Sequence, residues 1–133
     1  MLVVRHPVGG IRTFMRYVYR NFDPKDWKFT IIAPDLAQMK FLLEDLSMHD
    51  IKWVQVSDTA STLEISRIVF AQLRGGKYAL VHSHGFTSGM CAALPAFAMR
   101  TPHLMTSHDV INKNQFSGIK GRLKRNGMAI LFS

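Results

Sequence analysis

The sequence has a single cysteine, Cys91, among its 133 residues. One thiol cannot form a disulfide framework, so a disulfide-stapled secreted scaffold is excluded and a reducing, cytoplasmic compartment is expected. Long apolar runs are lacking as well, because the longest, Met90 to Met99, contains Pro95 and is too short to cross a bilayer. The first residues, Met1 to Val4, have neither the basic nor the long apolar region of a signal peptide, so none is expected.

Several ligand-binding motifs are also missing. The sequence contains no G-x-G-x-x-G fingerprint and no Walker A loop, which argues against a nicotinamide or P-loop role. His82, His84 and His108 include a known metal-ligand spacing, but few carboxylates accompany them and their expected places at strand ends explain them without a metal. We therefore expect no metal site. Basic residues interleaved with aromatic residues are lacking too, so no nucleic-acid partner is expected.

Acidic residues are absent after Asp109, whereas five lysines and arginines follow it and contribute five of the eight excess positive charges. Arg12, Arg16 and Arg20 recur every four residues and form one stripe on a predicted helix. These charges could rest on an anionic membrane surface, or the stripe could simply face water. A cytoplasmic protein is expected, with peripheral contact at the inner face of the membrane as one option.

The sequence alternates short β-rich runs with helical patterns, within an apolar fraction of 47% that is ordinary for one globular domain. Strands are predicted at residues 2–5, 27–33, 51–56, 78–83 and 102–107. Helices are predicted at about 11–22, 36–46, 61–74, 87–99 and from 117 onward. Five strand–helix steps without a hairpin signal predict an α/β fold, a Rossmann-like doubly wound parallel sheet with strand order 3-2-1-4-5.

This topology predicts where a ligand binds. In open α/β sheets, ligands bind beyond the carboxyl ends of the strands where the strand order reverses, here between the first and fourth strands. The loops at that point contain Gly9-Gly10 and His84-Gly85, and the loop after the fifth strand contains His108-Asp109. The unusual residues of the sequence therefore cluster at one predicted cleft.

Each of these loops has a functional and a structural interpretation. Gly9 and Gly10 could leave helix amides free for a phosphate, or form a plain tight turn. His84, at the mouth of its strand, is interpreted as a contact to a sugar hydroxyl or an acid–base group. His108 and Asp109 could contact the same ligand, while Asp109 could instead cap a turn.

The remaining histidines are interpreted differently. His82 lies one step deeper than His84 on the same side of its strand and is predicted to be a hydrogen-bonded core residue. His49 and His103 are interpreted as structural or surface residues, and His6 stays open.

Three segments, Gly9–Phe14, Val81–Phe86 and Thr101–Asp109, occur in an order and at intervals that resemble family 4 glycosyltransferases. The resemblance covers nearly the whole chain. It implies the N-terminal, acceptor-side half of a two-domain GT-B enzyme, which transfers a sugar from a nucleotide-sugar without a metal-binding Asp-x-Asp motif. Such enzymes are usually retaining hexosyltransferases, and they use no cofactor besides the donor substrate.

The resemblance also implies roles for individual residues. Gly9 and Gly10 match the loop near the donor diphosphate and the acceptor. His84 matches the histidine that contacts the transferred sugar at the reacting centre, and is the expected catalytic residue, while His108 matches a residue of the same cleft. The neighbouring motif residues are further substrate-binding candidates: Arg12, Gly85 and Asp109.

The family's nucleotide-binding Arg/Lys pair and Glu-x7-Glu motif are not found in residues 1–133. The chain is therefore expected to be a truncated N-terminal domain that needs a C-terminal domain or a partner chain to hold the donor. The expected function is transfer of a sugar to a saccharide or lipid-linked acceptor in the synthesis of cell-surface polysaccharide or glycolipid. The alternative is a non-catalytic, Rossmann-like binding or interaction module.

Overall fold

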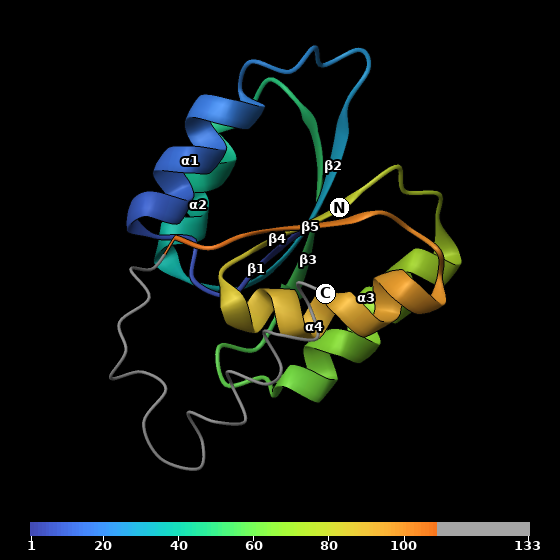
Figure 1. The fold of residues 1–133 in the computed structure, drawn as a ribbon. Coiled ribbons are helices and arrows are strands. Elements are labelled where there is room, and N and C mark those ends of the chain that lie inside the picture. Colours follow the sequence, from blue (N-terminus) through green and yellow to red (C-terminus); the bar gives the residue numbers. More distant parts are fainter. Residues whose placement is uncertain (109–133) are drawn as a thin grey trace.

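The computed structural model describes residues 1–108, so Asp109 and the helix expected from residue 117 lie outside the described part. Strands and helices alternate along the chain, and the sheet lies between two layers of helices (Figure 1). The elements are β1 (Leu2–Val4), α1 (Gly9–Tyr19), β2 (Lys28–Pro34), α2 (Ala37–Asp45), β3 (Asp50–Val56), α3 (Thr62–Gly75), β4 (Val81–His84), α4 (Phe86–Ala98) and β5 (His103–Thr106).

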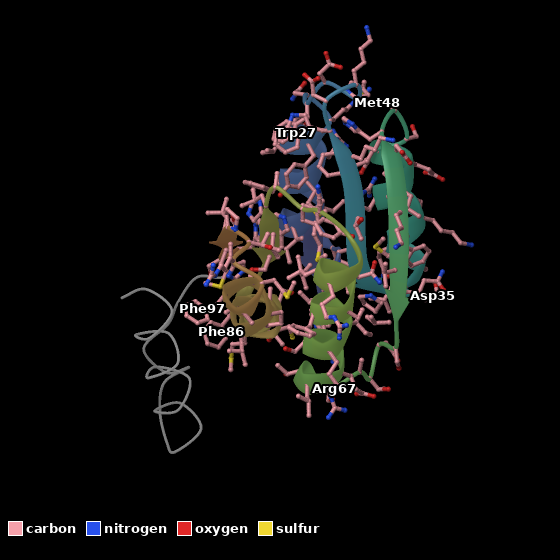
Figure 2. All side chains as sticks on the ribbon, turned by 90° about the vertical axis from the view of Figure 1, so that its right-hand side faces the viewer. Trp27, Asp35, Met48, Arg67, Phe86 and Phe97 are labelled. Atoms are coloured by element: carbon pink, nitrogen blue, oxygen red, sulfur yellow. The ribbon has the colours of Figure 1, made fainter. Side chains whose placement is uncertain are left out.

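The five strands form one parallel sheet in the order β3-β2-β1-β4-β5, which confirms the predicted topology. The central strand β1 pairs with β2 through Leu2 and Ile31, and with β4 through Val4 and His84. Figure 2 shows the common direction: Asp35 and Phe86, which follow β2 and β4, lie toward one end of the sheet, and Trp27 lies toward the other. Strand order reverses between β1 and β4, so the carboxyl ends of these two strands define the predicted ligand site.

Each face of the sheet buries its own apolar cluster, because successive strand residues point to opposite faces. Leu2 and Val4 of β1 pack beneath α1 and α2, whereas Val3 packs beneath α3 and α4. The first cluster consists of Leu2, Val4, Met15, Tyr19, Phe29, Ile31, Ala33, Met39, Leu42 and Leu46. The helices are thereby fixed against the sheet, and their first residues are held beside the strand ends.

Local signals in the sequence explain most boundaries, and the exceptions have a physical reason. The predicted capping box opens α3: Ser61 accepts from the Glu64 amide at 3.2 Å, and Glu64 accepts from the Ser61 amide at 2.6 Å. The fourth strand was predicted from residue 78 but begins at Val81. Its neighbours β1 and β5 begin opposite His82 and Val81, and before that point only the Leu80 carbonyl of the backbone is bonded to a neighbour, by the Met1 amino group at 2.8 Å within the described residues.

Helix α1 begins two residues earlier and ends three residues earlier than predicted. Gly9 takes a φ of +54° in the first turn, and the chain after Tyr19 leaves the helix through a turn closed by the Phe22 amide on the Tyr19 carbonyl. The sheet edges in the described part are β3 and β5.

Candidate active site

A pocket of about 280 Å³ lies at the carboxyl ends of β1 and β4. Residues from all three predicted loops line it: Arg5, His6, Val8, Gly10, Ile11, His84, Gly85, Phe86, Thr87, Ser88 and His108. Of the predicted site residues, the structure thus brings together Gly10, His84, Gly85 and His108. Gly9 directly precedes this lining, and Asp109 lies outside the described residues.

Two helices begin at the pocket without a side-chain cap. Neither Val8, which precedes α1, nor Gly85, which precedes α4, makes a side-chain capping hydrogen bond. The first amides of a helix lack partners within the helix, and the helix dipole places partial positive charge there. Two such helix starts on one small pocket favour an anionic group such as a phosphate.

Gly85 links β4 to α4 with a φ of +86° and a ψ of 158°. This conformation is essentially restricted to glycine, because a Cβ would clash with the residue's own backbone. Glycine at this position allows the chain to turn directly from His84 into the first turn of α4. The backbone requirement explains why glycine follows the histidine, independently of any ligand.

Arg5 adds a cation to the pocket that the sequence analysis did not single out. Its guanidinium donates to the backbone carbonyls of Ala60 and Asp58, and its amide donates to Ser88 Oγ at 3.0 Å. Within residues 1–108 no carboxylate lies in ion-pair range of Arg5, so its charge is held by dipoles alone. Its position in the sequence could have identified it as a site residue, because it is the first residue after β1, where the strand order reverses.

His84 lines the pocket, although only 1% of its surface is exposed. Its Nε2 is hydrogen-bonded to the Tyr19 hydroxyl at 2.9 Å, and its Nδ1 to His108 Nε2 at 3.1 Å. Burial, together with the neighbouring His82 and His108, lowers the pKa of His84 to about 3. The imidazole is therefore neutral near pH 7, and both of its ring nitrogens are already hydrogen-bonded within the protein.

His82 is the hydrogen-bonded core histidine that the sequence predicted. It is 5% exposed, with Nδ1 at 2.5 Å from the Tyr19 hydroxyl and Nε2 at 2.7 Å from Thr106 Oγ1. Burial lowers its pKa to about 4. Its ring stacks on that of His84, with the centroids 4.3 Å apart, and the His84 ring stacks in turn on that of His108 at 5.3 Å.

Helix α1 supplies two aromatic residues that complete this group of histidines. The ring of Phe14 lies 5.4 Å from those of His84 and His108, and Tyr19 places its hydroxyl between His82 and His84. Neither Phe14 nor Tyr19 is among the site residues expected from the sequence. Tyr19 lies four residues after the buried Met15, so helical spacing alone could have placed it on the buried face.

The structure does not bring Arg12 into the pocket. Arg12 Nε lies 2.7 Å from Asp45 Oδ2, and its guanidinium stacks over Phe41 of α2 at 5.2 Å. The expected substrate contact therefore has no support in the geometry. The helical turn after Gly10 and Ile11 rotates residue 12 away from the strand ends and toward α2.

His49 and His103 have structural roles, as predicted. His49 is buried and its Nε2 is hydrogen-bonded to the Tyr19 carbonyl at 2.9 Å, while His103 Nε2 is hydrogen-bonded to Ser83 Oγ at 2.8 Å. His6, which the sequence left open, is exposed and lines the pocket.

Two searches concern residues 1–108 only. No three or more histidine, cysteine, aspartate or glutamate side chains within them are arranged to hold a metal ion. No helix in this part is both long and apolar enough to pass through a bilayer.

Comparison with protein families gives one match. The model of a glycosyl transferase 4-like domain matches residues 9–131, which span nearly the whole chain and include the pocket residues from Gly10 onward. Comparisons with curated proteins and with solved structures gave no match.

Proposed function

Because the chain belongs to the glycosyl transferase 4-like family, we propose that it forms the acceptor-side half of an enzyme that uses a nucleotide-sugar donor. The acceptor in this proposal is a saccharide or a lipid-linked saccharide, made for cell-surface polysaccharide or glycolipid. The observation that carries the proposal is the pocket where two uncapped helix starts, Arg5 and the His84–His108 pair meet.

The donor diphosphate fits the positive side of this pocket. The amides at the starts of α1 and α4 and the guanidinium of Arg5 can all interact with phosphate oxygens. As the sugar is transferred, negative charge builds up on the leaving diphosphate. Fixed donors directed at that charge stabilise the transition state more than the ground state.

The sugar fits the histidine side of the pocket. His84 is neutral and so places no competing charge beside the sugar, and its two ring nitrogens are held by Tyr19 and His108. In the transfer, the bond between the sugar's anomeric carbon and the diphosphate breaks, and a bond to the acceptor oxygen forms. The acceptor's proton leaves with the diphosphate, whose oxygens are the basic groups nearest the reacting carbon.

This route suits the composition of the lining. None of the described residues that line the pocket is a carboxylate, so the paired carboxylates of glycoside hydrolases have no counterpart among residues 1–108. We expect a hexosyl group and retention of the anomeric configuration. The configuration of the product, measured by NMR, tests that part separately.

A second nucleotide-binding body is part of the proposal. Sites for small molecules span roughly 300–1,000 Å³ and enclose most of the ligand, and a nucleotide-sugar is a large ligand. The pocket of about 280 Å³ has room for only part of it. A second domain or a partner chain facing this pocket would supply the remaining contacts, chiefly to the base and ribose.

Transfer in the complete enzyme tests the proposal. His84→Ala should lower sugar transfer by roughly a hundredfold, because it removes a group beside the reacting carbon. His49→Ala is the matched control, since His49 is also buried but lies away from the pocket. Near-normal turnover in His84→Ala, with the protein folded, would refute the assigned role.

The location proposed for the enzyme is the cytoplasmic side of a membrane, where the basic residues contact anionic lipid. Arg16 and Arg20 of the stripe form no ion pair within residues 1–108, whereas Arg12 is neutralised by Asp45. Replacing Arg16 and Arg20 by glutamine should weaken binding to phosphatidylserine vesicles. Unchanged binding would remove this part of the proposal.

The non-catalytic alternative has one observation in its favour. Met90, Leu94 and Phe97 recur at helical spacing along α4 and form an apolar stripe, with Leu94 71% and Phe97 83% exposed. Such a stripe is typical of a surface that another protein covers. If the complete protein binds nucleotide-sugars without transferring sugar to any acceptor, the alternative is favoured.

A further inference from the structure

Behind the pocket, a continuous chain of hydrogen bonds passes through one tyrosine. Its order is Thr106, His82, Tyr19, His84, His108, with steps of 2.7, 2.5, 2.9 and 3.1 Å. Tyr19 comes from α1, while the other members come from β4, from β5 and from the segment after β5. Within this series of hydrogen bonds, His82 and His84 are connected through the Tyr19 hydroxyl.

The interior of this chain is shielded from water. Tyr19, His82 and His84 are 4%, 5% and 1% exposed. Burial keeps both imidazoles neutral near pH 7 and raises the pKa of the Tyr19 hydroxyl above its usual range. Each of the two imidazoles then carries one N–H, and the tyrosine carries one O–H, so no water or additional proton can repair a mismatched pair.

These proton counts allow two consistent arrangements. In the first, Tyr19 donates to His82 Nδ1 and accepts from His84 Nε2, and His84 Nδ1 accepts from His108 Nε2. In the second, every bond is reversed, so that Tyr19 donates to His84 Nε2 and His84 Nδ1 donates to His108 Nε2. From the first arrangement, changing only His82 would leave the buried Tyr19 O–H without an acceptor in this group, and changing only His84 would set a ring lone pair against the tyrosine oxygen. The tautomers must therefore change together.

We propose that Tyr19 is a positioning residue that couples the tautomer of His84 to that of His82, which is in turn hydrogen-bonded to Thr106. These residues behind the pocket then determine which ring nitrogen of His84 carries the proton. In the first arrangement His108 donates inward through Nε2, and in the second it accepts there. The role of this coupling in sugar transfer rests on the proposed function, whereas the coupling itself does not.

The coupling can be measured on the chain without any substrate. Long-range proton–nitrogen NMR spectra of the histidine rings at pH 7 report which nitrogen carries the proton. In Tyr19→Phe, the tautomer populations of both His82 and His84 should shift, because their shared partner is lost. Tyr17→Phe is the matched control, since Tyr17 lies on the same helix, is 62% exposed and accepts through its hydroxyl from Arg16 Nη2 at 3.1 Å.

Thr106→Val gives the sharper test, and it decides the matter if Tyr19→Phe does not fold. Valine keeps the shape of threonine but removes the hydroxyl that meets His82 Nε2. The proposal expects the His84 spectrum to change as well, although Thr106 is hydrogen-bonded to His82 and not to His84. If Thr106→Val alters His82 alone, or if a folded Tyr19→Phe leaves His84 unchanged, the coupling is refuted.

The complete enzyme then separates the coupling from the proposed function. Tyr19→Phe should lower kcat for sugar transfer by roughly ten- to a hundredfold, with little change in the KM for the donor, because the phosphate contacts are untouched. Shifted spectra in an enzyme that transfers no sugar would uphold the coupling and refute the proposed function. Shifted spectra with an unchanged kcat would refute the role of Tyr19 in transfer.

Discussion

Gly89 of α4 lies directly against Met105 of β5: a Cβ built on Gly89 would lie 2.2 Å from Met105 Sδ and 3.0 Å from its Cγ. The helix can approach the sheet this closely only because residue 89 has no side chain. The contact holds the beginning of α4, and with it Thr87 and Ser88 of the pocket, at a fixed distance from the strand ends.

Gly89→Ala should lower the free energy of unfolding by about 1 kcal/mol, since the strain at Met105 outweighs the roughly 1 kcal/mol that alanine contributes to a helix. The same change in a Met105→Ala background should be stabilising, because the clash is gone and the helical preference remains. Urea unfolding of the four variants gives the coupling energy. If the two substitutions change the free energy of unfolding additively, Gly89 and Met105 do not interact and this explanation is wrong.

Gly85→Ala should destabilise the chain by about 1–3 kcal/mol, because its φ of +86° and ψ of 158° are strained for any residue with a Cβ. Gly10→Ala is the control: it also lines the pocket, has nothing within 4 Å of a built Cβ and has no positive φ. Thermal unfolding of both variants checks this. Equal losses would mean that backbone conformation at residue 85 is not the cause.

Two arginines near the start of α1 should behave in opposite ways toward anions. Arg5→Met should weaken the binding of inorganic pyrophosphate by about tenfold, the loss of one charge-assisted contact. Arg12→Met should leave that binding unchanged and lower stability only slightly, because it removes a partly exposed ion pair with Asp45. Calorimetric titration measures the first effect, and urea unfolding the second. Weaker pyrophosphate binding in Arg12→Met would contradict the geometry.

Acid should destabilise the fold through His82 and His84. Their pKa values are lowered to about 4 and about 3, so the folded state keeps them neutral while the unfolded state takes up protons below about pH 6.5. The contribution of these two neutral histidines to the free energy of unfolding is fully present above that pH. It is lost as the pH falls toward their pKa values in the folded state. Between pH 6 and 4 the slope should approach about 1.4 kcal/mol per pH unit for each histidine.

Replacing His82 by glutamine should reduce this slope by the share of one histidine. Unfolding curves recorded at several pH values measure both slopes. A slope that is identical with and without His82 would place the acid sensitivity elsewhere.

The sequence was sufficient to predict the topology and three of the pocket's loops, because strand–helix alternation and turn glycines are local signals. It did not predict the Tyr19 links, since they depend on how α1 is rotated against the sheet. Arg12 was misplaced for the same reason: its partner Asp45 lies on another helix, and helical spacing says nothing about that packing. The late start of β4 followed from where its neighbours begin, which is likewise a tertiary property.

The two edges of the sheet differ in how they would meet another strand. Along β3, the exposed Asp50 and Lys52 interrupt the edge with charge, and the Asp50 carboxylate is paired with Lys28. Such charges discourage pairing with a further strand. Within residues 1–108, β5 has no charged residue, and it adjoins the apolar stripe of α4. In the described part of the chain, charge therefore discourages the addition of a strand at β3, whereas β5 carries no such charge.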